Sequence, residues 1–176
     1  MDGSLTRIFD VLTFQRLRYP NAGVMHFGYG QKESVYGIDA LWDHAGRCAG
    51  WLKSQNLYKG DQILILAGPA SFSWFVLDFG CQIAGVIPII IPEYFPQEEI
   101  IHCISSTACR YFFYDKIEFW DFIPETIQNS EITWISLQDQ VTPLHASLES
   151  ILSDSIPVNE DLLSQWCSEI QSEDTA

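Results

Sequence analysis

The chain has 176 residues, of which 47% are hydrophobic and only 18% are charged, and its formal net charge is −14. This length and composition favour one globular domain with a real core over a disordered chain. The acidic excess argues against a nucleic-acid partner, because few basic residues are available to neutralise phosphates, and against anionic lipid headgroups.

Residues 1–36 predict a helix followed by a hairpin. Thr6 can cap a helix that runs to about Leu17, and Tyr19-Pro20 ends it. The short strands 24–27 and 34–36 flank two glycines, Gly28 and Gly30. We interpret this pair as part of a turn, because a phosphate loop would need a third glycine and a following helix.

Residues 37–136 predict the central core, which opens with a helix. Asp39 is expected to cap this helix, and Asn56 is expected to end it in the left-handed conformation. Gly46 and Gly50 lie one turn apart and would let another element pack closely. The apolar face consists of Leu41, Ala45, Cys48, Ala49 and Leu52.

The stretch 57–92 predicts a parallel βαβ unit. Residues 62–67 and 86–92 are short apolar runs rich in Ile and Val, as parallel strands covered on both faces require. Ser71 can cap the connecting helix and Gly85 can end it. Pro88 cannot donate a ladder hydrogen bond, so we expect a bulge or an edge position in the second strand.

The same alternation continues toward the C-terminus. Pro96 fits the first turn of a helix with its apolar face inward, and residues 110–114 and 132–136 predict two more strands. Between these strands, Asp115 is expected to cap a short helix that Pro124 interrupts. The inward face of the helix that begins near Pro96 is expected to hold Ile100, Ile101, Cys103 and Ile104.

Residues 137–176 predict a helical extension, whose last helix is capped by Asn159. Its apolar positions form two sets, Leu144, Leu148, Ile151 and Leu152, then Leu162, Leu163, Trp166, Cys167 and Ile170. Taken together, residues 1–176 predict a single α/β domain: a doubly wound, mainly parallel sheet with helices on both faces.

Groups that could carry chemistry are present but not arranged for it. Asp39 and Asp43 are four residues apart, and Glu98 and Glu99 are adjacent, yet capping and complementing a helix start explain both pairs. No GxSxG or GxxxxGK[ST] motif occurs. The histidines are scattered along the sequence: His26, His44, His102 and His145. The tryptophans are more typical of a core than of a ligand platform: Trp42, Trp51, Trp74, Trp120, Trp134 and Trp166. We therefore predict no catalytic, cofactor-binding or metal-binding residue in this chain.

The cysteines show neither a CxxC motif nor a Cys/His cluster at metal spacing. They are Cys48, Cys81, Cys103, Cys109 and Cys167. An odd number of thiols, mostly within apolar patterns, predicts buried free cysteines in a reducing cytoplasm. No signal peptide is visible, and no apolar run is long enough to span a membrane.

The order of these elements resembles the N-terminal part of the adenylate-forming (AMP-binding) superfamily, which includes acyl-CoA synthetases. The family's Gly-Asp before a hydrophobic strand corresponds to Gly60-Asp61, and its Ala-Gly-Ala/Val with a nearby Pro corresponds to Ala84-Gly85-Val86 and Pro88. The segment 6–12 and Trp74 are most similar to long-chain fatty-acid–CoA ligases, while 79–87 also resembles fatty-acyl-AMP ligases.

Two departures weaken the subfamily assignment more than the fold. Of the family's Tyr-x-Glu-Leu run only Leu41 is kept, and of its Asn-Arg/Ser-Pro-Glu-Trp stretch only Trp74. The end of the chain, 173–176, resembles the run that leads into the family's phosphate loop. The resemblance therefore implies a truncated first lobe, with the phosphate loop, the metal-binding acid, the ribose-binding Asp and the C-terminal lysine domain beyond Ala176.

The resemblance implies a parent enzyme that uses ATP, Mg and CoA to convert a long-chain fatty acid first to an acyl-adenylate and then to acyl-CoA. This segment alone is expected to be inactive, to bind none of these cofactors, and to contact the remaining domains of its own chain or self-associate through the same surface. A fatty-acyl-AMP ligase is one alternative, and a non-catalytic α/β binding or assembly module is another. The expected location is cytoplasmic, with peripheral membrane contact left open.

Overall fold

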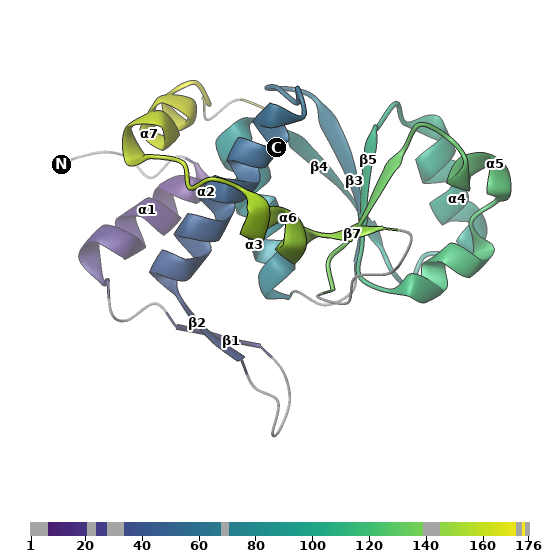
Figure 1. The fold of residues 1–176 in the computed structure, drawn as a ribbon, viewed down its shortest axis with the longest axis horizontal. Helices are drawn as coiled ribbons and strands as arrows, with labels where there is room; N and C mark the ends of the chain where they lie inside the picture. Colours follow the sequence, from purple (N-terminus) through teal and green to yellow (C-terminus); the bar gives the residue numbers. More distant parts are fainter. Residues whose placement is uncertain are drawn as a thin grey trace.

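A computed structural model of the chain describes residues 7–20, 24–27, 34–67, 71–138, 145–171 and 174. Its centre is a five-stranded sheet in the order β4-β3-β5-β6-β7, in which every neighbouring pair is parallel (Figure 1). The strands are β3 (Gln62–Ala67), β4 (Ile87–Pro92), β5 (Tyr111–Tyr114), β6 (Thr133–Ser136) and β7 (Ala146–Ser147). Helices cover both faces, so the predicted α/β fold class is confirmed.

The predicted βαβ unit is formed by β3, α3 (Phe72–Ala84) and β4. The Ser71 hydroxyl accepts a hydrogen bond from the Trp74 backbone N–H at 3.1 Å, which caps α3. Gly85 ends the helix with φ 78°, in the region that glycine adopts without strain. Pairing with β3 runs residue for residue along β4 without a bulge, and β4 lies at the edge of the sheet, where Pro88 is tolerated.

One face of the sheet is covered by α2 (Ile38–Ser54), α3 and α6 (Leu148–Asp154). The predicted apolar face of α2 is buried, with Ala45, Cys48 and Leu52 fully enclosed. Outside α2 lie two further helices, α1 (Ile8–Arg18) and α7 (Glu160–Ser168), on the side away from the sheet (Figure 1).

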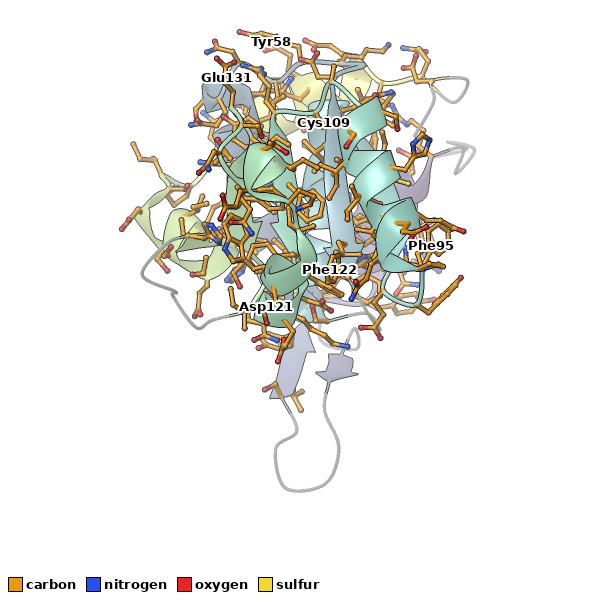
Figure 2. The ribbon with its side chains drawn as sticks, turned by 90° about the vertical axis from the view of Figure 1, so that its right-hand side faces the viewer. Tyr58, Phe95, Cys109, Asp121, Phe122 and Glu131 are labelled. Atoms are coloured by element: carbon orange, nitrogen blue, oxygen red, sulfur yellow. The ribbon has the colours of Figure 1, made fainter. Side chains whose placement is uncertain are left out.

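The other face is covered by α4 (Gln97–Ser106), the 3₁₀ helix η1 (Ile117–Phe122) and α5 (Glu125–Gln128). Figure 2 looks onto this face. Tyr58, Cys109 and Glu131, which each precede a strand, lie toward its upper end, and Phe95 and Phe122, which each follow one, lie lower. All strands thus point their carboxyl ends toward the same edge of the sheet, as a parallel sheet requires.

Two short strands lie apart from the sheet. The predicted hairpin is present as β1 (Val24–Phe27) and β2 (Ser34–Gly37), paired antiparallel, and its predicted glycine turn lies outside the described residues. At the other end of the chain, Asn159 caps α7 as predicted, by accepting a hydrogen bond from the Leu162 N–H at 2.8 Å. Asn56 adopts the predicted left-handed conformation, with φ 58°.

Two predicted caps are wrong. Strand β2 runs directly into α2, so the residue before the helix is Gly37, and Asp39 lies inside the first turn, where it pairs with Arg16. Asp115 does not cap η1, because Lys116 occupies the cap position of the 3₁₀ helix, and this cap has no side-chain hydrogen bond. Thr6 and Leu144, predicted as a cap and a helix-face residue, lie outside the described residues.

Among the helices in the described ranges, none combines the length and the apolar character that crossing a bilayer demands.

Candidate functional site at the carboxyl edge of the sheet

The strand order indicates which edge of the sheet is the candidate binding site. Numbered along the chain, the five strands are arranged 2-1-3-4-5, and the order reverses at β3, which has β4 on one side and β5 on the other. In open parallel sheets, ligands bind outside the carboxyl ends of the strands at such a reversal. The residues that follow β3, β4, β5 and β6 therefore form the candidate site.

A hydrogen-bonded pair joins the last residue of β5 to the residue that leads into β7. Tyr114 ends β5 and His145 immediately precedes β7, and the Tyr114 Oη and His145 Nδ1 atoms are 2.7 Å apart. Burial lowers the pKa of His145 below its ordinary value, so the neutral imidazole is favoured. A neutral ring has one donor and one acceptor nitrogen, and either can match the tyrosine hydroxyl.

Aromatic rings pack around His145 on the face of the sheet that η1 covers. Trp120 of η1 stands edge-on to His145, with ring centroids 4.4 Å apart, and edge-on to Trp134 of β6, at 5.1 Å. Trp134 is 7% exposed. The cavity between these rings, Phe112 and their neighbours measures about 10 Å³, the space of one water, and its lining is apolar. This cluster forms a wall and has no room for a substrate.

Several polar groups nearby are engaged, whereas the buried Trp134 Nε1 has no hydrogen-bond partner among the described residues. Lys116, after β5, forms an ion pair with Glu93, after β4, and so bridges the two segments that flank the strand-order reversal. The Ser136 hydroxyl accepts a hydrogen bond from the Gln138 N–H at 3.1 Å, and the Ser147 hydroxyl caps α6. Neither serine is placed next to a base that could activate it as a nucleophile.

The described residues do not fit magnesium ATP. Of the described basic side chains, all but the exposed Arg18 bind carboxylates or backbone carbonyls of the chain itself: Arg7, Arg16, Arg47, Lys53, Lys59, Arg110 and Lys116. Among the described residues, no three His, Cys, Asp or Glu side chains converge as metal ligands.

The carboxylates and histidines weighed from the sequence are dispersed. Asp39 and Asp43 lie on α2, where they bind Arg16 and Arg47, whereas Glu98 and Glu99 lie in the first turn of α4, across the sheet. Of the four histidines, His44 bonds to the Ala40 carbonyl, His102 is exposed on α4, and the side chain of His26 is outside the described residues. Among the described histidine side chains, His145 contacts Tyr114 at the end of β5, and His44 stands edge-on to Phe72, which follows β3.

All five cysteines are free, as predicted. Burial raises the pKa of Cys48 to about 12 and that of Cys167 to about 11. Both thiols stay protonated at neutral pH, so neither supplies a thiolate nucleophile. The predicted core role of the tryptophans is also confirmed: Trp42 and Trp134 are buried, and the remaining four pack against one of the two cores.

The family profile of AMP-binding enzymes matches residues 15–175 of the sequence. The chain belongs to the AMP-binding enzyme family. As a member of this family it has the fold of the N-terminal lobe of adenylate-forming enzymes, a parallel sheet flanked by helices. No curated protein sequence matches the chain.

Solved structures share the fold of this AMP-binding chain. A fatty acyl CoA synthetase from Mycobacterium tuberculosis is 19% identical in sequence; the match covers 88% of this chain and 29% of the synthetase, with a TM-score of 0.66. A fatty acid AMP ligase from Legionella pneumophila is 18% identical; the match covers 89% of this chain and 26% of the ligase, with a TM-score of 0.63. A benzoate CoA ligase from Burkholderia xenovorans is 16% identical; the match covers 83% of this chain and 28% of the ligase, with a TM-score of 0.64. The chain thus spans between a quarter and a third of the length of these proteins.

Proposed function

We propose that the chain is the N-terminal lobe of an ATP-dependent long-chain fatty-acid–CoA ligase. The observation that carries this proposal is the family match over residues 15–175, combined with a fold shared with a fatty acyl CoA synthetase over 29% of that protein's length. In the proposed parent reaction, a fatty-acid carboxylate attacks the α-phosphorus of magnesium ATP and releases pyrophosphate, and CoA thiolate then displaces AMP.

The role proposed for this lobe is a scaffold with no catalytic residue. Seven of its described basic side chains are bound within the chain, its described residues lack a metal-ligand set, and the aromatic wall of Trp120 and Trp134 encloses no substrate-sized space. ATP, magnesium and CoA would be held by the remaining domains of the parent. The free thiols support a cytoplasmic location, since cysteines stay reduced there.

The test compares the 176-residue chain with the full product of its reading frame, by measuring fatty-acid-dependent exchange of pyrophosphate into ATP. We expect exchange from the full product and none from the 176-residue chain. Exchange by the 176-residue chain would overturn the scaffold role. A full product that exchanges pyrophosphate only with aryl acids would overturn the fatty-acid assignment.

A fatty-acyl-AMP ligase is the second candidate, favoured by the fold shared with the Legionella pneumophila enzyme. Such an enzyme stops at the adenylate. Adding CoA to the full product and following acyl-CoA by mass spectrometry separates the two, because only the CoA ligase consumes CoA.

A non-catalytic binding or assembly module is the remaining candidate. The proposed lobe should expose an apolar surface that the rest of the enzyme covers, and α1 does present Val11, Phe14 and Leu17 to solvent, with Leu17 72% exposed. We therefore expect the 176-residue chain to self-associate in sedimentation velocity. A strictly monomeric, highly soluble chain would favour the independent module.

A further inference from the structure

A groove of about 700 Å³ lies across the sheet from the aromatic wall. Its floor and walls come from α2, α6, α7 and the segment 155–159 that joins the last two helices. The apolar side chains that line it include Trp51, Ile151, Val158, Leu162 and Trp166. A groove of this size accommodates several large side chains of a binding partner.

The groove is held in shape by contacts within the chain. Arg47 donates a hydrogen bond from Nη1 to the Ser155 carbonyl at 2.8 Å, which fixes the start of the joining segment against α2. At Gly50, an added Cβ would lie 2.7 Å from Val158 Cγ2, so the absence of a side chain lets the segment approach α2 closely. The groove is therefore a preformed feature, which reduces the entropic cost of binding.

Its lip is apolar and exposed. Ile156, in the joining segment, is 85% exposed, and Leu162 of α7 is 36% exposed. Both side chains line the groove and so extend its apolar surface, and contiguous exposed apolar surface marks an interaction site.

The unpaired charges beside the groove are negative. No residue from 117 to 176 is Lys or Arg, whereas twelve are Asp or Glu. Asp154 lines the groove and Asp161 adjoins Leu162; both are exposed, and neither forms an ion pair within the described part of the chain. The two basic side chains of α2 beside the groove are bound: Arg47 pairs with Asp43 as well as bonding to the Ser155 carbonyl, and Lys53 Nζ lies over the Trp166 ring at 5.1 Å and bonds to the Ala84 carbonyl.

We propose that this groove, formed by α2, α6, residues 155–159 and α7, docks a basic amphipathic helix of a partner protein. Large apolar side chains of the helix enter between Trp51 and Trp166, and flanking Lys or Arg side chains face Asp154 and Asp161. This is the helix-in-groove mode of recognition, with selectivity for basic partners set by the carboxylates at the lip.

The test titrates the 176-residue chain with a labelled helical peptide that carries Leu on one face and Lys on the other, by fluorescence anisotropy. Ile156→Ser should weaken binding about fivefold or more, because it removes apolar contact at the lip. Ile117→Ser, which removes an exposed apolar side chain on η1, across the sheet, should leave affinity unchanged. Equal loss in both variants, or no loss in Ile156→Ser, would overturn the proposal.

Charge requires a separate control, because a chain of net charge −14 attracts any cationic peptide. The pair Asp154→Asn and Asp161→Asn should weaken binding more than the matched pair Glu98→Gln and Glu99→Gln on α4. Equal weakening would mean non-specific attraction and contradict the proposal. A peptide with Glu in place of Lys should not bind.

Nuclear magnetic resonance of the indole N–H groups locates the peptide. Signals of Trp51 and Trp166 should shift on binding, while those of Trp120 and Trp134, across the sheet, should not. The titration is repeated with any longer product of the same reading frame. Loss of peptide binding there would show that the chain's own later residues occupy the groove, and would overturn the partner assignment without affecting the proposed ligase function.

Discussion

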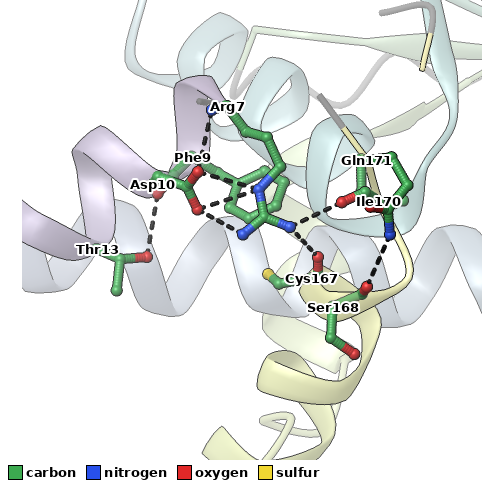
Figure 3. A network of polar contacts seen from close by, with 8 residues as sticks. All are labelled: Arg7, Phe9, Asp10, Thr13, Cys167, Ser168, Ile170 and Gln171. Atoms are coloured by element: carbon green, nitrogen blue, oxygen red, sulfur yellow. Dashed lines mark hydrogen bonds and ion pairs between the residues drawn. The ribbon is translucent and has the colours of Figure 1, made fainter. Parts of the chain in front are cut away.

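Arg7 and Cys167 are separated by 160 residues in the chain, yet Arg7 Nη1 donates a hydrogen bond to the Cys167 carbonyl at 2.7 Å. The same nitrogen donates to the Ile170 carbonyl at 2.7 Å, and Asp10 holds the guanidinium from the other side (Figure 3). Carbonyls at the end of a helix lack partners within it. Arg7 therefore caps the C-terminal end of α7 and fastens the first described helix to the last.

Replacing Arg7 with Ala should destabilise the fold by about 1–3 kcal/mol, because charge-assisted hydrogen bonds to two carbonyls and the ion pair with Asp10 are lost, although Asp10 keeps its hydrogen bond from the backbone N–H of residue 7. Urea unfolding followed by tryptophan fluorescence measures the change. Arg18→Ala, at the exposed end of the same helix, is the matched control and should change stability by less than about 0.5 kcal/mol. Similar values for both variants would show that the Arg7 contacts contribute nothing.

Gly80 should be intolerant of substitution. A Cβ at this position would lie 2.7 Å from both Cβ and Sγ of Cys48 and 3.2 Å from the Ala45 carbonyl oxygen, so α2 and α3 would have to separate. Gly80→Ala should destabilise by about 1–3 kcal/mol, although Ala favours a helix by about 1 kcal/mol over Gly.

Gly46→Ala is the comparison for Gly80→Ala, since its Cβ would meet only the Leu163 side chain, whose end can move. We expect a smaller loss, or a gain from helix propensity, in thermal unfolding. A larger loss at Gly46 than at Gly80 would contradict the packing argument.

The parts of the fold that the sequence predicted are those with local signals. The apolar strands, Ser71 before α3 and Gly85 after it each act within a few residues, so the βαβ unit could be derived without knowing the tertiary structure. Strand β7 could not be derived, because Ala146 and Ser147 have no strand propensity and become a strand only by pairing with β6.

The candidate site was missed for a related reason. Tyr114 and His145 lie 31 residues apart, and nothing in either local sequence marks them as partners. Their contact depends on β5, β6 and β7 being neighbours in the sheet, and strand order was not predictable from the residues. From the sequence alone, His145 therefore could not be distinguished from the other three histidines.

Asp78 on α3 should cost stability at neutral pH. Burial raises the pKa of its carboxyl above the ordinary value, and a hydrogen bond from Gln82 only partly offsets this. The folded state therefore binds the proton more tightly, and stability falls as pH rises from the unfolded pKa through the folded one.

Asp78→Asn keeps an acceptor for Gln82 and removes the charge, so it should stabilise the fold at neutral pH by a few tenths to about 1 kcal/mol. The gain should vanish in acid, below the unfolded pKa of Asp. Chemical unfolding at both pH values measures it, with the exposed Asp121→Asn as control. A gain that is the same at both pH values would refute the link to ionisation.

His145 should make the fold less stable in mild acid. Because burial depresses its pKa, the unfolded chain takes up a proton before the folded chain does, and the contribution of His145 is complete above the ordinary histidine pKa and is lost as pH falls toward the folded value. His145→Gln retains a hydrogen-bonding group for Tyr114 but cannot be protonated. Between about pH 7.5 and pH 5.5, wild type should therefore lose more unfolding free energy than the variant.

Chemical unfolding across this pH range measures the difference in unfolding free energy between wild type and His145→Gln. The contributions of the other titratable groups cancel in this difference. His102→Gln is the control, because His102 is exposed on α4, away from the Tyr114 pair. It should follow the wild-type pH profile. A His145→Gln profile parallel to wild type would mean that the partly buried imidazole is protonated without cost, and that the Tyr114 contact tolerates the imidazolium.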